Sequence, residues 1–193
     1  DSMDTPMIDQ AKLESFLART VSDLSAGHAG VMVSIGTKLG LYKAMAGAGP
    51  LTPRELTARA GCAERSERYV AEWLNSQVAG GYVDYHAISQ TYELSAEQAM
   101  VLAHEDSPVF MPHAWQVTAT LWLDEEKTLE AFRTGKGVAW GDHDERLYCG
   151  VAAFYRNAYR GSLVSQWLPT LDGVVERLEA GRFTLEIAPV ELD

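Results

Sequence analysis

The chain has 193 residues, of which 47% are hydrophobic and 22% are charged, and this balance is typical of a globular protein with a sizeable core and not of a disordered chain. Sixteen lysines and arginines stand against 27 aspartates and glutamates, which gives a formal net charge of −11. This charge argues against nonspecific binding to nucleic acid or to an anionic membrane surface.

Cysteine content, hydropathy and the first residues bear on the compartment. Cys62 and Cys149 are far apart and show no metal-ligand spacing, which favours a reducing environment. No apolar run reaches the length of about 18–20 residues that a membrane span needs. The start, Asp1-Ser2-Met3, lacks the pattern of a signal peptide, and Asp1-Ser2 is typical of a cloning remnant. These features predict a cytoplasmic protein without membrane association.

The first predicted elements are two helices. Helical spacing of apolar residues predicts an amphipathic helix over about residues 9–26, which Gly27 and Gly30 should interrupt. A second helical run should follow and end at Gly47-Ala-Gly-Pro50. The apolar stripe of the first helix could form a dimer contact or pack within its own subunit. The two stripes consist of Leu13, Phe16, Leu17, Val21 and Leu24, and of Ile35, Leu39, Tyr42 and Met45.

The segment 47–98 shows the element order of a winged helix-turn-helix. Thr52-Pro-Arg-Glu55 is a capping box with proline at the first helical position, and Gly61 should end this short helix. A helix over about 66–79 and strands at 82–86 and 91–94 should follow, before a second capping box at Ser95-Ala-Glu-Gln98. The expected buried face of the 66–79 helix consists of Tyr69, Val70, Trp73, Leu74 and Val78.

A winged helix can read DNA or serve as a structural and dimerisation module. Arg65 and Arg68 are the candidates for facing a DNA groove. Between Gly47 and Ser95, however, four arginines stand against six acidic residues, whereas DNA-binding surfaces are usually basic. The local charge therefore favours the structural role.

From Ser107 the pattern is again helical. Trp115, Thr118, Trp122 and Leu129 trace one stripe, and a glycine-rich break follows at residues 135–141. A helix is predicted near residues 142–160, and Pro169 should begin a new turn or kink the apolar run after it. The predicted fold class is therefore mainly α, with a winged helix-turn-helix, a small β-hairpin and additional long helices.

Several of these stretches resemble a known enzyme family. Residues 35–45, 49–56, 65–74 and Gly80-Gly-Tyr82 resemble the amino-terminal module of class I S-adenosylmethionine-dependent methyltransferases of the small-molecule O-methyltransferase type. The later stretches Trp140-Gly-Asp-His-Asp-Glu-Arg146 and Phe154-Tyr-Arg-Asn-Ala-Tyr-Arg160 are similar to an actinobacterial subgroup. The resemblance covers about residues 8–180.

The resemblance implies a homodimer in which residues 8–104 form a winged-helix dimerisation region and residues 105–180 form a helical substrate lid. It also implies a small, hydrophobic or aromatic substrate whose oxygen or nitrogen accepts the methyl group. In the complete enzyme, S-adenosylmethionine would be bound by a Rossmann domain that follows these regions.

Residues 181–193 fall where the family begins that cofactor domain. Glu186 could stand for the acidic residue that ends the first strand. Ala188, Val190 and Leu192, however, occupy the expected glycine positions, and Pro189 restricts the backbone. The segment could reflect a truncation, a splice across missing residues or an unrelated strand. The 193-residue sequence alone is therefore expected to bind no S-adenosylmethionine and to be inactive.

The second half supplies the candidate site residues. His143 is a candidate catalytic base because histidine titrates near neutrality, although it could also be a solvated residue at a helix start. A metal site at residues 142–144 is not expected, because adjacent helical residues point in different directions. The resemblance places Tyr155 and Tyr159 nearest the cofactor domain, where Arg156 or Arg160 could reach a carboxylate. The predicted substrate-binding residues, each of which could instead be a packing residue, are His113, Trp115, Trp140, Tyr148 and Phe154.

Two functions of other classes remain open. A winged-helix transcriptional regulator would show salt-dependent DNA binding. A stand-alone dimer module for small ligands would bind an aromatic compound but not S-adenosylmethionine.

Overall fold

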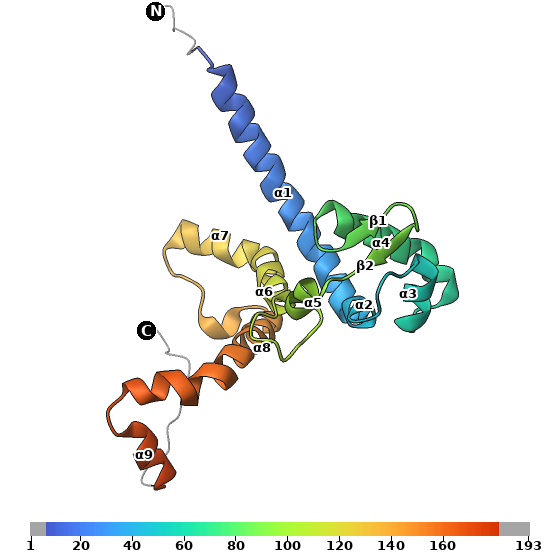
Figure 1. Ribbon diagram of the computed structural model, residues 1–193. Coiled ribbons are helices and arrows are strands. Elements are labelled where there is room, and N and C mark those ends of the chain that lie inside the picture. Colours follow the sequence, from blue (N-terminus) through green and yellow to red (C-terminus); the bar gives the residue numbers. More distant parts are fainter. Residues whose placement is uncertain (1–6, 182–193) are drawn as a thin grey trace, which may run out of the picture. The chain divides into compact units, whose positions relative to one another are not determined.

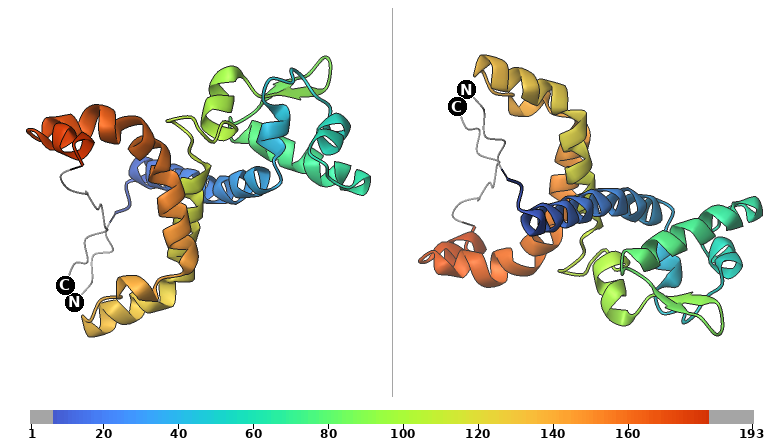
Figure 2. Two further views of the ribbon diagram at one scale, coloured as in Figure 1. Left: turned by 90° about the horizontal axis from the view of Figure 1, so that it is seen from below. Right: turned by 90° about the horizontal axis from the view of Figure 1, so that it is seen from above.

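The computed structural model describes residues 7–181, which fold mainly into α-helices (Figures 1 and 2). The chain divides into two compact units, with the boundary between Ser95 and Ala96. The mainly α fold class with a winged helix and a small hairpin is confirmed. No helix in the described part of the chain combines the length and the apolar character that crossing a membrane would require.

The longest element is helix α1, Gln10–Lys38. Asp9 caps its start, since the Asp9 carboxylate accepts a hydrogen bond from the backbone N–H of Lys12 at 3.2 Å. The predicted interruption at Gly27 and Gly30 is wrong, because a glycine inside a helix costs only about 1 kcal/mol relative to alanine. The chain leaves the helix only at Gly40, whose φ of 68° is a left-handed conformation that glycine adopts without strain.

The core of the first unit lies where the end of α1 meets α2 (Leu41–Met45), α3 (Pro53–Arg59) and α4 (Glu67–Ala79). Gly36 of α1 lies against the indole of Trp73, whose Nε1 donates a hydrogen bond to the Met32 carbonyl at 2.9 Å. The buried Tyr42 hydroxyl donates to the Gln77 side chain. Polar groups in this core are therefore paired, and the helices can approach closely. The largest fully buried apolar side chains here are those of Tyr42, Leu41, Met45, Leu56, Leu74 and Val33.

Two stripes of the first unit differ from their predictions. On α4, Val70, Trp73 and Leu74 are buried as expected, but Tyr69 is 76% exposed. Gln77 takes the fourth place on the buried face because its hydrogen bond to Tyr42 satisfies its amide. Two residues of the predicted second-helix stripe, Ile35 and Leu39, are also exposed, whereas Tyr42 and Met45 are buried.

The capping box and the hairpin form as predicted. The Thr52 hydroxyl accepts from the Glu55 backbone N–H at 3.3 Å, and the Glu55 carboxylate accepts from the Thr52 backbone N–H at 2.8 Å. A short 3-10 turn, η1 (Glu64–Ser66), leads into α4. The wing consists of β1 (Asp84–His86) and β2 (Thr91–Glu93), which pair antiparallel with Tyr85 opposite Tyr92.

The second unit consists of α5 (Ala96–Leu102), α6 (Pro112–Leu123), α7 (Glu125–Thr134), α8 (Glu145–Ser162) and α9 (Val174–Glu179). A 3-10 turn, η2 (Trp140–Asp142), precedes α8. Two short turns, the π-helical η3 (Leu163–Trp167) and the 3-10 η4 (Leu168–Thr170), lie between α8 and α9, and Pro169 falls in η4 as the sequence predicts.

Helices α6 and α8 pack closely. Gly150 of α8 is buried, and a Cβ at this position would lie 2.9 Å from Cγ2 of Val117 on α6. Nδ2 of Asn157 donates to the carbonyl of Ser107 at 2.8 Å, which fixes the other end of α8 against the segment before α6. Of the predicted stripe, Thr118, Trp122 and Leu129 lie at the surface, and the stripe is not on one helix, since α6 ends at Leu123 and Leu129 lies on α7.

Candidate functional site

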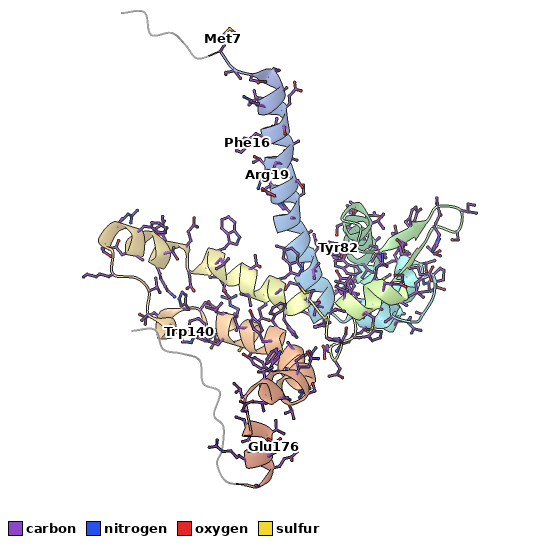
Figure 3. The ribbon with its side chains drawn as sticks, turned by 60° about the vertical axis from the view of Figure 1, so that its left-hand side comes forward. Met7, Phe16, Arg19, Tyr82, Trp140 and Glu176 are labelled. Atoms are coloured by element: carbon purple, nitrogen blue, oxygen red, sulfur yellow. The ribbon has the colours of Figure 1, made fainter. Side chains whose placement is uncertain are left out.

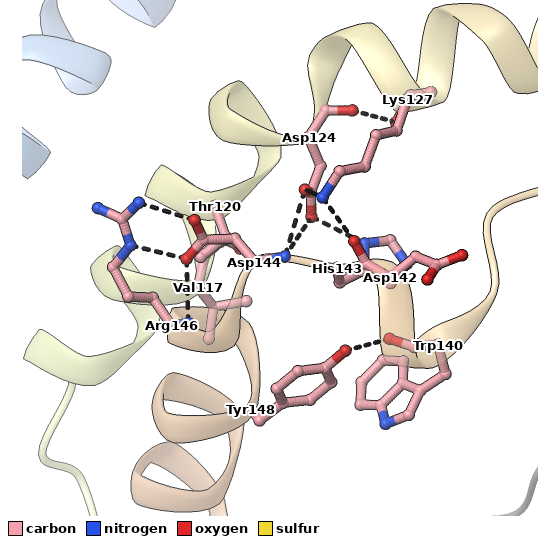
Figure 4. Close-up of polar contacts among 11 residues, drawn as sticks. Val117, Thr120, Asp124, Lys127, Trp140, Asp142, His143, Asp144, Arg146 and Tyr148 are labelled. Atoms are coloured by element: carbon pink, nitrogen blue, oxygen red, sulfur yellow. Dashed lines mark hydrogen bonds and ion pairs between the residues drawn. The ribbon is translucent and has the colours of Figure 1, made fainter.

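A cluster of polar side chains joins the end of α6, the start of α7 and the turn before α8 (Figure 4). The Asp124 carboxylate lies at its centre and is only 4% exposed as a residue. Its Oδ1 accepts from Nζ of Lys127 at 2.7 Å, and its Oδ2 accepts from Nδ1 of His143 at 2.8 Å. The backbone N–H of Asp144 lies 3.2 Å and 3.3 Å from the two oxygens. A buried carboxylate is tolerated here because three donors satisfy it.

These donors keep Asp124 ionised. The hydrogen bonds from Lys127 and His143 lower the pKa of Asp124 from 3.8 to about 2. The hydrogen bond to Asp124 raises the pKa of the Lys127 ammonium. Lys127 also donates to the Asp142 carbonyl at 2.5 Å, so this one side chain connects α7 to the turn that carries His143.

The start of α8 is fixed by a second carboxylate. Asp144 caps the helix, since its carboxylate accepts a hydrogen bond from the backbone N–H of Arg146 at 3.1 Å. The same carboxylate also accepts hydrogen bonds from Nε and Nη2 of the Arg146 side chain at 2.7 Å and 2.8 Å. This forked contact lowers the pKa of Asp144 to about 2.

His143 has a defined orientation. Its side chain is 24% exposed, so the alternative of a solvated residue at a helix start does not describe it. Because an ionised carboxylate faces Nδ1, the neutral imidazole carries its hydrogen on Nδ1 and leaves Nε2 as an acceptor. Trp140 lies edge to face with the imidazole, at a centroid distance of 5.9 Å.

Three predicted site residues thus lie together. The Trp140 ring is 5.1 Å from that of Tyr148, whose hydroxyl donates to the Trp140 carbonyl, and Trp140 also contacts His143. Their catalytic or substrate-binding roles stay predictions. Sequence analysis does not identify Asp124 and Lys127 as members, because they belong to the charged run Asp124-Glu-Glu-Lys127 and nothing in that run marks Asp124 as buried.

An apolar groove of about 470 Å³ lies beside the polar cluster. We call it the α6–α7 groove. The side chains of Trp122 and Phe132 on its wall are 75% and 86% exposed, which is unusual for residues of this size. Its polar edge includes His143 and Asp124. Its apolar wall consists of Leu121, Trp122, Leu129, Phe132 and Leu147.

The other predicted aromatic residues form a separate row along α8. The Phe154 and Tyr155 rings are 5.0 Å apart, Tyr155 and Tyr159 are 6.3 Å apart, and Tyr159 lies 5.5 Å from Trp167. Tyr155 and Tyr159 are exposed, and their predicted contact with a cofactor stays a prediction. Arg160 lies 3.9 Å from the Asp106 carboxylate.

His113 and Trp115 lie in the first turns of α6, at the opposite end of the helix from Asp124. The His113 ring is 5.2 Å from that of Phe110, and burial lowers the pKa of His113, with Arg156 acting in the same direction and Glu105 opposing it. Trp115 is partly buried. The sequence-predicted site residues therefore fall into three groups. Among residues 7–181 there is no cluster of three or more histidine, cysteine, aspartate or glutamate side chains suited to a metal ion.

Two comparisons with known proteins found a match. Residues 27–104 match the family model described as the Rv2258c-like winged HTH domain. No curated protein matches the chain. Among solved structures, the chain is similar to one described as PigF with SAH, with a TM-score of 0.57 and 14% sequence identity; the match covers 86% of this chain and 55% of that one. The chain thus spans about half the length of this structural relative, and its residues 27–104 are similar to the Rv2258c-like winged HTH domain.

Proposed function

We propose that this chain is the winged-helix and substrate-recognition part of an S-adenosylmethionine-dependent methyltransferase. The likeness to PigF with SAH carries the proposal. SAH, S-adenosylhomocysteine, is what remains of S-adenosylmethionine after its methyl group has been transferred. The matched winged HTH domain, residues 27–104, supports the same assignment, because the sequence resemblance to methyltransferases includes this region.

The proposal assigns recognition to this chain and cofactor binding to the remainder of such an enzyme. Within residues 7–181 the strands are β1 and β2, which form one antiparallel pair, whereas a Rossmann-like cofactor site needs several parallel strands. In the complete enzyme, the acceptor oxygen or nitrogen would attack the methyl carbon in line with the departing sulfur. The helices described here would orient the acceptor and exclude water.

Binding of SAH tests this assignment. The native protein, isolated from its source with an antibody against this chain, should have a mass well above 21.2 kDa and bind SAH. At an SAH concentration of one hundred times Kd, its stability should rise by about 2.7 kcal/mol in a thermal-shift measurement. The 193-residue polypeptide should show neither this shift nor transfer of a labelled methyl group. Methyl transfer by the 193-residue polypeptide alone, or a native protein that does not bind SAH, would contradict the proposal.

The surface of the winged helix does not favour DNA binding. In η1 and the first turns of α4, Arg65 and Arg68 are interspersed with Glu64, Glu67 and Glu72, so the exposed side chains carry no net positive charge. A protein that neutralises phosphates needs a basic surface. We therefore assign the winged helix a structural role.

We also propose that the chain forms a homodimer through α1. The amino-terminal half of α1 extends beyond the core of the first unit, and its side chains, Phe16 and Arg19 among them, are exposed (Figure 3). Gly30, Val33 and Gly36 pack on the core, whereas another face repeats with alternating steps of four and three, which is the spacing of a coiled coil. We call this face the α1 seam. It consists of Leu17, Val21, Leu24, His28, Val31 and Ile35.

A second copy fits the α1 seam because the seam is self-complementary. The flanking residues Ala18, Thr20, Ser25 and Gly27 carry no charge that would repel an identical helix. Most of the stability of a protein helix comes from packing of its apolar face, so pairing of two α1 helices would stabilise them.

Light scattering coupled to size exclusion tests the dimer. The wild-type chain should have twice the monomer mass of 21.2 kDa, and Val21→Glu should be monomeric, because it buries a charge in the seam. Ala26→Glu introduces the same side chain on the opposite face and should remain dimeric. A wild-type monomer, or a dimeric Val21→Glu variant, would refute the seam as the interface.

A further inference from the structure

The α6–α7 groove combines an apolar wall with the oriented imidazole of His143 at its polar edge. Trp122, Phe132 and Leu129 supply flat and aliphatic surface, and the volume of about 470 Å³ is in the range of small-molecule sites. His143 lies at its edge, and the orientation of its ring is defined because Nδ1 lies 2.8 Å from the Asp124 carboxylate. Among the hydrogen bonds of residues 7–181, His143 takes part through Nδ1 and not through Nε2.

The hydrogen-bonding chemistry of His143 at the edge of the groove determines which polar group a ligand needs there. An imidazole that donates from Nδ1 to a carboxylate presents a basic lone pair at Nε2, which accepts a hydrogen bond and cannot donate one while the ring is neutral. Lys127 and the Asp144 backbone hold the carboxylate in place, so turning the imidazole would break its hydrogen bond to Asp124. The complementary group on a ligand is therefore a donor, such as a hydroxyl.

We propose that the α6–α7 groove binds a flat aromatic alcohol, with its rings against Trp122 and Phe132 and its hydroxyl donating to Nε2 of His143. This site is separate from the aromatic row of α8, which the sequence singles out. The proposal rests on the substrate recognition proposed above and names its ligand class, but its test measures binding by this chain without any cofactor, so its failure is distinguishable from a failure to bind SAH.

A matched pair of probes tests the hydrogen bond on the wild-type chain. Calorimetry with 2-naphthol and with 2-methoxynaphthalene, which has the same rings but no O–H, should give one site per chain. 2-Naphthol should bind about five to ten times more tightly. The methyl ether is the more hydrophobic probe, so nonspecific apolar binding would give the reverse order. Absence of binding, or equal or reversed affinities, would overturn the proposal.

Substitutions test the location. His143→Phe keeps a ring but removes the acceptor, so the two probes should bind with equal affinity. Leu121→Ala on the groove wall should weaken both probes about fivefold. Leu171→Ala removes the same atoms from an exposed leucine elsewhere in the second unit and should change neither affinity. If Leu171→Ala weakens binding as much as Leu121→Ala does, or if His143→Phe keeps the preference for 2-naphthol, the groove is not the site.

Discussion

Replacing Gly36 with alanine should lower the free energy of unfolding of the first unit by about 2 kcal/mol. A Cβ at this position would lie 2.3 Å from Cζ2 of Trp73 and 2.9 Å from Cε2 of Tyr42. Both rings are buried, and hydrogen bonds from Trp73 to the Met32 carbonyl and from Tyr42 to Gln77 fix them. Overpacking at such a site costs about 3 kcal/mol. Alanine recovers only about 1 kcal/mol through its higher helix propensity.

Gly27 provides a matched control in the same helix. A Cβ there would meet nothing within 4 Å, so Gly27→Ala should raise stability by about 0.5–1 kcal/mol. Urea unfolding followed by tryptophan fluorescence and far-UV circular dichroism would measure both variants. Changes of the same sign at the two positions would show that Gly36 is not at a tight helix crossing.

The contrast between these glycines shows what the sequence could and could not predict. Gly27 and Gly30 looked like helix ends, but the helix passes through them and stops at Gly40. A sequence does not distinguish a glycine that ends a helix from one that lies inside it. The backbone φ and the packing of neighbouring elements determine which of the two it is. The capping box at Thr52 and Glu55 was predictable because all its partners lie within four residues.

The candidate site shows the same division. His143, Trp140 and Tyr148 were predicted from residue type, and the structure places them together. The partner that orients His143, Asp124, lies 19 residues earlier on another helix. Helical periodicity describes one segment at a time, so it cannot predict which side chains of two segments meet. For the same reason it marked Trp122 and Leu129 as one stripe without showing that they line a groove.

Replacing Asp124 with asparagine should destabilise the second unit. Asparagine offers a single acceptor oxygen, whereas Lys127, His143 and the Asp144 backbone all donate to the carboxylate. The amide would also direct its own donors at one of these groups and leave the Lys127 ammonium without its counter-charge. Removing one partner of a buried ionic contact is usually strongly destabilising. Thermal unfolding followed by near-UV circular dichroism should show a lower Tm at pH 7, whereas Asp172→Asn, at an exposed aspartate of the same unit, should leave the Tm unchanged.

The pH dependence of these variants distinguishes loss of the ionic contact from a general packing defect. The pKa of Asp124 is lowered from 3.8 to about 2 in the folded chain, so ionisation of its carboxylate favours the fold. Its contribution is complete above about pH 4 and is lost as the pH falls through about 2, and Asp144 contributes over the same range. The Tm of the wild type and of Asp172→Asn should therefore fall steeply between these pH values. The Tm of Asp124→Asn should fall less, because of these two carboxylates Asp144 alone then remains to be protonated. Parallel Tm curves for wild type and Asp124→Asn would show that the carboxylate makes no ionic contribution to the fold.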